Sequence, residues 1–423
     1  MKINLAYGKT GLAIDLNDDY DITIVEPRFE SGLVEPPLEI NRVLQHPIKF
    51  EPLSDWIDSR HTVGVVVNDI TRATPYRIIL PLLLDRLSHL PDSQVVLFNA
   101  TGTHRKNTPE ELAEMYGEEI CDRYKIVQND AMADDEHRSI AITRSGNEIK
   151  VNKAFIECDR KILTGFIEPH LFAGFSGGGK AVMPGLAHID TIMHHHSPLF
   201  LDHEMATWGV TRGNPLWEEI YEAAGFLEPM FLLNVALNRE KQITEVFAGD
   251  LTEAHRQGCR YVRKHAMVPV GAPFDIVIST NSGHPLDLNL YQSVKGMSAA
   301  RQILKKKGSL VMAADCYDGI PEHGSYGSLL SEAKTPAELI RKIQKKGYRM
   351  QDMWQAYIHA KICRDVDVHF YTRELSSDQL RSAFLTPCEN IEATVDRLVR
   401  KHSGNARICV LPEGPQTIAY VDN

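Results

Sequence analysis

Residues 168–187 read EPHLFAGFSGGGKAVMPGLA and place a lysine directly after a run of glycines. Gly174, Gly179 and Lys180 almost spell a nucleotide-binding P-loop, in which the residue after the lysine is Ser or Thr because its hydroxyl holds magnesium on the phosphates. Ala181 stands at that position here. A P-loop-like nucleotide-dependent enzyme is therefore disfavoured, and Lys180 needs another role.

The glycines before this lysine permit close approach of a ligand. Gly177, Gly178 and Gly179 allow positive φ, so their N–H groups are candidates for binding an anionic group beside Lys180. The alternative is a flexible turn. A turn alone does not explain a lysine fixed at its end, and a lysine amine becomes a nucleophile when it is desolvated.

Two more loops after predicted strands carry candidate catalytic residues. Asp69 and Arg72 lie in NDITRATP, between a strand and the start of a helix, where a helix N-terminus and a guanidinium suit a phosphate or carboxylate. The alternative interpretation is structural: Asp69 caps the helix and Arg72 is an ordinary surface residue. His104 follows FNATGT, and His170 precedes Lys180 by ten residues. Each imidazole is a candidate general base, and the alternative for each is a structural loop histidine.

Four histidines follow in HIDTIMHHHSPLF, at positions 188, 194, 195 and 196. Their spacing does not match HExxH, and adjacent histidines on a helix point about 100° apart. One of the last three is a candidate metal ligand if other donors come from elsewhere, since imidazole suits nickel, copper, iron or zinc.

Composition limits the class of protein. A chain of 423 residues predicts two or three domains, and a formal charge of -10 disfavours non-specific nucleic-acid binding. The seven cysteines form no CxxC pair, which favours reduced thiols. No run approaches the ~20 apolar residues of a membrane span, and the N-terminus lacks an apolar signal core. We therefore expect a cytoplasmic protein that binds neither nucleic acid nor membrane.

Strand and helix patterns alternate along the chain. β-branched or apolar runs at 62–70 and 93–104 are each followed by a helical pattern, at 74–90 and 108–124. This alternation predicts an α/β fold in which mostly parallel sheets are flanked by helices. A Pro- and Gly-rich break near 264–275 predicts two domains, 1–265 and 266–423. The last strand-like segments could finish the second sheet or return to the first domain.

A set of short motifs, taken in their order along the chain, resembles the lactate racemase family of nickel-pincer 2-hydroxyacid racemases and epimerases. The motifs are DITR, GTHR, EPH, GGGK with MPG, a later histidine, YQSVK and Trp354. The resemblance covers most of the chain. It implies that Lys180 is joined by a thioamide to a nickel-pincer nucleotide, pyridinium-3,5-bisthiocarboxylic acid mononucleotide nickel. It also implies that nickel is bound by the histidine about sixteen residues after the lysine, which is His196. An insertion or deletion in the loop would instead favour the neighbouring His194 or His195.

The same resemblance implies roles for the remaining candidates. His104 and His170 look like two general bases, one for each enantiomer. Five residues resemble those that lie around the cofactor and the substrate carboxylate: Asp69, Arg72, Tyr291, Gln292 and Lys295. Trp354 resembles the residue that forms a wall of the pocket. The implied reaction inverts C2 of a 2-hydroxy acid by hydride transfer to the cofactor ring, through a 2-keto acid. The implied site lies in a cleft over which the second domain closes, and the implied partners are cofactor-maturation enzymes.

A non-catalytic carrier of the nickel cofactor is the main alternative. A carrier would keep Lys180 and His196 but would not need both His104 and His170.

Overall fold

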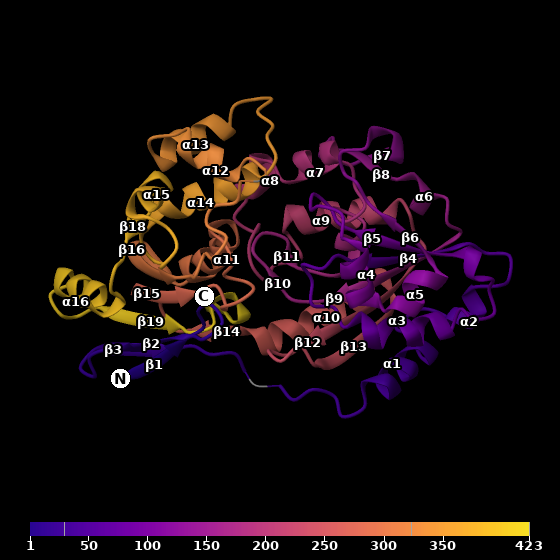
Figure 1. The fold of residues 1–423 in the computed structure, drawn as a ribbon, viewed down its shortest axis with the longest axis horizontal. Coiled ribbons are helices and arrows are strands. Elements are labelled where there is room, and N and C mark those ends of the chain that lie inside the picture. The colour runs from indigo at the N-terminus through magenta and orange to yellow at the C-terminus, as the bar shows by residue number, and fades with distance from the viewer. Residues whose placement is uncertain (29, 323, 423) are drawn as a thin grey trace. The chain divides into compact units, whose positions relative to one another are not determined.

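The computed structural model describes residues 1–28, 30–322 and 324–422, and its contacts divide the chain into two compact units. The central unit is Phe29–Arg263. The terminal unit combines Met1–Arg28 with Lys264–Asn423. Each unit contains a six-stranded sheet with helices packed against it (Figure 1).

The sheet of the central unit has the order β13-β12-β9-β4-β5-β6 and is parallel except for β13, which runs antiparallel to β12 at one edge. Its central strands are apolar on both faces, as expected for a parallel sheet covered on both sides. The strands are β4 (Val63–Asn68), β5 (Val95–Ala100), β6 (Lys125–Gln128), β9 (Arg160–Phe166), β12 (Met230–Leu237) and β13 (Ile243–Asp250).

Helices on one face of this sheet share a core with Val63, Val65 and Val67 of β4. They are α1 (Pro36–Gln45), α2 (Leu53–Trp56), α3 (Tyr76–Asp85), α4 (Pro109–Tyr116) and α5 (Glu118–Arg123). The pattern at 108–124 predicts one helix, but the structure has two, because Gly117 adopts φ +101° between α4 and α5. Phe98 and Phe155 pack edge to face on the other side of the sheet.

Further helices of the central unit surround the loops that follow the strands: α6 (Lys153–Ile156), α7 (Ile189–His195), α8 (Pro198–Leu201), α9 (Pro215–Gly225) and α10 (Leu251–Ala266), whose last residues pass the unit boundary. Two hairpins complete this part of the chain. They are β7 (His137–Ile142) with β8 (Glu148–Asn152), and β10 (Pro169–His170) with β11 (Gly174–Phe175).

The sheet of the terminal unit is parallel throughout, in the order β18-β17-β16-β15-β19-β3. Its strands are β3 (Asp21–Ile24), β15 (Phe274–Thr280), β16 (Leu304–Ala313), β17 (Asp367–Tyr371), β18 (Thr386–Pro387) and β19 (Arg407–Leu411). Its helices are α11 (Leu290–Arg301), α12 (Tyr326–Ser331), α13 (Pro336–Ile343), α14 (Met353–Asp365), α15 (Ser377–Ser382) and α16 (Ile391–Lys401). The α/β class with parallel sheets and two domains is confirmed.

The predicted boundary at 265 needs one correction, because the first 28 residues belong to the terminal unit. β3 pairs in parallel with β19, and the hairpin of β1 (Lys2–Leu5) and β2 (Leu12–Asp15) shares a core with α16. Alternation identifies these strands but does not identify their partner. The last strands also stay in this unit, since β20 (Ile418–Val421) pairs with β14 (Met267–Val270).

Among the described residues, no helix combines the length and the apolar character that crossing a membrane requires.

The position of the N-terminal hairpin predicts which unit a core substitution there destabilises. Ile14 is 3 % exposed and shares its cluster with Val395 and Leu398 of α16. Ile14→Ala should cost about 2–5 kcal/mol, as buried large-to-small changes do. Hydrogen–deuterium exchange should show the lost protection in 264–422. Val34→Ala, at a side chain that is 98 % exposed, is the control. Loss of protection confined to residues 30–263 would contradict the assignment.

Candidate active site

Three adjacent strands bring the predicted loops of the central unit to one edge of its sheet. β9, β4 and β5 are neighbours and run in parallel, so the loops after them leave from the same side. Asp69 and Arg72 follow β4, His104 follows β5, and His170 follows β9. Ligands of open α/β sheets bind at this carboxyl edge.

The side chains of Asp69 and His104 form a hydrogen-bonded pair. His104 Nδ1 lies 2.6 Å from Asp69 Oδ2, and Thr71 donates to Asp69 Oδ1 at 2.7 Å. Asp69 is buried, whereas the side chain of His104 is 42 % exposed. Burial, the largest single influence, would raise the pKa of Asp69, but the hydrogen bond and charge of His104, the charge of Arg72 and the hydrogen bond from Thr71 together lower it. The carboxylate therefore holds the proton of the neutral ring on Nδ1, which directs the lone pair of Nε2 outward.

Arg72 and His170 connect the loop after β4 with the loop after β9. Arg72 Nη1 lies 3.8 Å from Glu168 Oε1, an ion pair that the sequence did not predict. His170 Nδ1 accepts a hydrogen bond from the backbone N–H of Ala173 at 3.3 Å. The neutral His170 ring therefore carries its proton on Nε2, the opposite tautomer to that of His104.

The glycine-rich loop is held by side chains of the protein itself. Gly178 donates its N–H to Asn234 Oδ1 at 2.9 Å. Gly178 has φ +56°, and an added Cβ would lie 2.5 Å from the phenol oxygen of Tyr221. The N–H of Gly178 is thus used within the protein, and anion binding by this loop stays a prediction. Glycine is required here because α9 and β12 approach the backbone closely.

Lys180 ends this loop, within a short 3₁₀ turn at Gly178–Ala181. Its positive charge lowers the pKa of three imidazoles, which places its amine near His195, His196 and His255. Burial is the larger cause in each case, and it lowers the pKa of His195 and of His255 to about 4. All three rings are thus neutral at pH 7.

The three consecutive histidines differ in their hydrogen bonds. His195 Nε2 donates to Leu216 O at 2.9 Å, so its Nδ1 is an acceptor, 3.1 Å from His196 Nδ1. His196 Nδ1–H also points to Ile192 O at 3.1 Å, which leaves Nε2 as the nitrogen with a lone pair. His194 Nε2 lies 3.2 Å from Ser145 Oγ. His196 therefore carries its proton on Nδ1, whereas His195 carries its proton on Nε2.

Ring contacts join His170 to this group. Phe172 meets the His170 ring edge to face at 4.6 Å and the His196 ring at 5.1 Å. Within the described residues, no group of three or more His, Cys, Asp or Glu side chains is arranged to hold a metal ion.

The remaining candidates belong to the terminal unit. Tyr291, Gln292 and Lys295 occupy the first turns of α11, which follows β15, and the partly buried Tyr291 ring packs on Tyr326. Trp354 lies in the first turn of α14 and is buried. Gln355, next to it, donates to the Tyr291 carbonyl at 2.6 Å. α14 thereby fixes the start of α11.

Several residues of the site carried no sequence signal. Glu168 lies inside the quoted EPH motif, yet its pairing with Arg72 could not be foreseen. Asn234, Tyr221 and His255 come from β12, α9 and α10, 34 to 79 residues from their partners along the chain. The sequences of β12, α9 and α10 have the pattern of ordinary core elements and gave no indication of these contacts.

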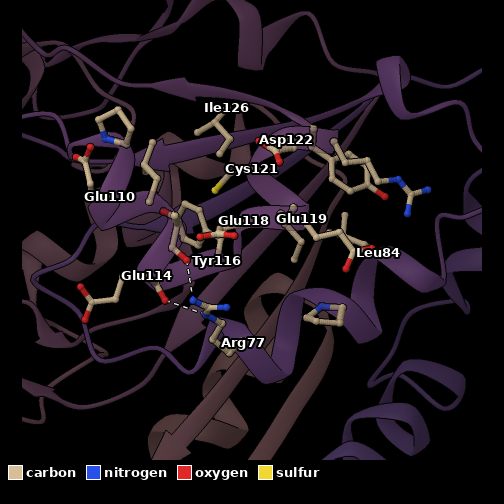
Figure 2. Close-up of a pocket in the computed structure, with 18 of the residues that line it drawn as sticks. Arg77, Leu84, Glu110, Glu114, Tyr116, Glu118, Glu119, Cys121, Asp122 and Ile126 are labelled. Carbon is tan, nitrogen blue, oxygen red and sulfur yellow. Dashed lines mark hydrogen bonds between the residues drawn. The ribbon is translucent and has the colours of Figure 1, made fainter.

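A cavity of 1430 Å³ lies away from these loops, among α3, α4, α5 and β6 (Figure 2). None of the predicted site residues lines it. Arg77 there donates to the carbonyls of Ala113 and Glu114, at 2.8 and 2.9 Å, and so caps the end of α4. Carboxylates surround it: Asp85, Glu110, Glu114, Glu118, Glu119 and Asp122. This cavity holds no acid–base pair like Asp69 with His104.

Comparisons with known proteins agree with this architecture. The model of the lactate racemase N-terminal domain matches residues 7–209, and that of the lactate racemase C-terminal domain matches residues 270–419. A lactate racemase of Thermoanaerobacterium thermosaccharolyticum is 34 % identical over 421 residues, 98 % of each chain. A lactate racemase of Lactiplantibacillus plantarum is 34 % identical over 418 residues, 97 % of this chain and 98 % of that one.

Solved structures give the same result. The lactate racemase apoprotein from T. thermosaccharolyticum matches with a TM-score of 0.92 at 32 % identity, over 99 % of this chain and 100 % of that one. A Thermotoga maritima protein with a TM-score of 0.71 and 17 % identity, over 93 % of this chain and 100 % of that one, shares the fold.

The fold and these matches define an enzyme of the isomerase class that acts as a racemase. The chain belongs to the lactate racemase family.

The Asp69 hydrogen bond predicts the tautomer of His104. In the parent protein at a pH of about 8, the ¹⁵N spectrum should show the His104 proton on Nδ1, because the ring donates to the carboxylate. Asp69→Ala should move the proton to Nε2. Thr71→Ala removes the donor to Oδ1 and a 3.5 Å contact with His104 Nδ1 but keeps the carboxylate, so it should leave the tautomer unchanged. An Nε2–H ring in the parent protein would contradict the geometry.

Proposed function

We propose that this chain interconverts the enantiomers of lactate or of a closely related 2-hydroxy acid, with a nickel-pincer nucleotide attached to Lys180. The observation that carries this proposal is the opposite protonation of two imidazoles at one sheet edge. His104 offers a lone pair at Nε2, and His170 offers a proton at Nε2. The relatives named lactate racemase support the choice of substrate.

The residues present fit such a cofactor. Lys180 provides an amine near buried neutral imidazoles, and His196 has the tautomer that leaves Nε2 for a metal. One of the relatives is described as an apoprotein, which fits an enzyme that requires a cofactor. When bound, the nickel-pincer pyridinium supplies a ring carbon that takes a hydride from C2 and returns it. Cofactor-maturation enzymes are the proposed partners, and the cytoplasm is the proposed location.

The protein's own residues handle the proton and the charge of the substrate. His104 takes the hydroxyl proton of one enantiomer at Nε2, and Asp69 stabilises the imidazolium that forms. His170, in its protonated form, returns a proton from Nε2 to the oxygen for the other enantiomer and becomes neutral, and the two rings exchange these tasks in the reverse direction. Arg72 binds the substrate carboxylate, because its guanidinium presents several N–H donors in one plane.

Four residues of the terminal unit complete the proposal. Tyr291, Gln292 and Lys295 are the proposed contacts of the substrate or the cofactor, and Trp354 is the proposed wall of the pocket.

Two alternatives lose support. A P-loop enzyme needs backbone N–H groups for phosphates, but Gly178 uses its N–H on Asn234. A carrier does not need the Asp69–His104 pair, and the relatives are named for an activity.

Turnover in deuterium oxide tests the function and the fate of the C2 hydrogen. Enzyme made together with its maturation enzymes should convert L-lactate to D-lactate that retains the substrate C2 hydrogen, because a hydride held on carbon does not exchange with solvent. Chiral chromatography and mass spectrometry measure this. Lys180→Ala should fold, carry no mass increment and form no product. Extensive deuterium at C2 would indicate direct proton exchange between the histidines, and an adduct on Lys180→Ala would refute the attachment.

Nickel content distinguishes the three histidines. His196→Ala should lose nickel, because only its Nε2 is placed as a donor. His195→Ala removes the acceptor beside His196 Nδ1 and should weaken nickel binding by about 10–100-fold, as the loss of a residue that orients a metal ligand does. His194→Ala should retain nickel. Metal analysis of matured protein, with melting temperatures as the folding control, measures these effects. Equal loss in His194→Ala would contradict the assignment.

A further inference from the structure

Two side chains bind the glycine-rich loop from behind. His255 of α10 hydrogen-bonds through Nε2 to the carbonyl of Ser176 at 2.8 Å, and its Nδ1 contacts the hydroxyl of Tyr221 on α9. The Tyr221 hydroxyl also lies against Gly178, since a Cβ added there would be 2.5 Å from it. One Tyr–His pair therefore bonds the loop at Ser176 and packs against it at Gly178.

The direction of each hydrogen bond follows from the chemistry of the groups. A carbonyl can only accept, so His255 donates Nε2–H to Ser176. The Nδ1 of the neutral ring must then accept, and Tyr221 donates its O–H to it. Only neutral His255 in one tautomer completes this set.

The environment keeps His255 in that form. The residue is 1 % exposed, and burial, assisted by the charge of Lys180, lowers its pKa to about 4. Gly178 lies against both rings, since an added Cβ would be 2.6 Å from His255 Nδ1. Trp217 stacks on the outer face of the Tyr221 ring at 4.1 Å. The pair cannot shift without moving the loop.

We propose that Tyr221 and His255 are positioning residues that clamp the backbone at Ser176 and Gly178, and thereby fix the direction in which Lys180 leaves the loop. This inference rests on the proposed function for the significance of Lys180. The clamp itself is a property of the protein without its cofactor. The rings also pack in the core, so a test must remove hydrogen bonds while retaining volume.

Tyr221→Phe removes the O–H and keeps the stacked ring. In the apoprotein, hydrogen–deuterium exchange of the Gly178 amide should become at least tenfold faster, because Gly178 donates to Asn234 while it packs against the two rings. In protein made with the maturation enzymes, the fraction of chains with a mass increment on Lys180 should fall at least tenfold. His255→Gln keeps a donor for Ser176 and should recover more of both properties than His255→Ala.

Tyr326→Phe is the matched control. Tyr326 contacts His359 Nδ1 at 2.7 Å, and His359 Nε2 bonds to the Ala383 carbonyl at 2.8 Å, so the terminal unit contains the same tyrosine–histidine–carbonyl arrangement. This variant should lower the melting temperature as much as Tyr221→Phe, yet leave Gly178 exchange and Lys180 loading unchanged.

The outcomes separate the clamp from simple packing. If Tyr221→Phe lowers the melting temperature like the control but leaves the exchange and the loading at parent values, the clamp is refuted. If the parent protein itself carries no adduct, the proposed function is refuted, while the Gly178 exchange rate in the apoprotein still decides the clamp.

Discussion

The candidate site depends on the adjacency of three parallel strands. Because β9, β4 and β5 are neighbours, the loops after them start within reach of one another, and short side chains suffice to connect them. Asp69 joins the first loop to His104 of the second, and Arg72 joins it to Glu168 of the third. An insertion of one strand between β4 and β9 would separate the imidazoles by about 5 Å more and break these contacts.

Burial gives each imidazole of the central unit a defined role. His104 is partly exposed and lies beside the carboxylate of Asp69, at the edge of the sheet. His195 and His255 are buried, and each donates one N–H to a backbone carbonyl. Such rings orient their neighbours and do not titrate near neutral pH. Histidine therefore serves for proton transfer at the carboxyl edge of the sheet, and buried histidines orient the neighbouring side chains and backbone.

Much of the fold and of the site followed from local sequence. Strands, helices and the boundary near 264 follow from periodicity and from Pro and Gly, and the ordered motifs place His104, His170 and Lys180 after strands. The pattern could not show that Gly178 contacts Asn234 and Tyr221, because contacts between distant segments depend on packing. Nor could it show which sheet receives β3, since a parallel strand carries no mark of its partner.

The divided terminal unit has a consequence for synthesis on the ribosome. β3 is made among the first 28 residues, but its partner β19 begins at Arg407. At about 5–20 residues per second, roughly 20–80 s pass before the partner emerges. The central unit is contiguous in sequence and can fold during this interval. The apolar side chains of Ile3, Leu5 and Ile14 stay exposed to solvent until the C-terminal segment that buries them is made. The nascent chain is thus most exposed to aggregation at its very beginning, and a chaperone that binds early and releases late would protect it.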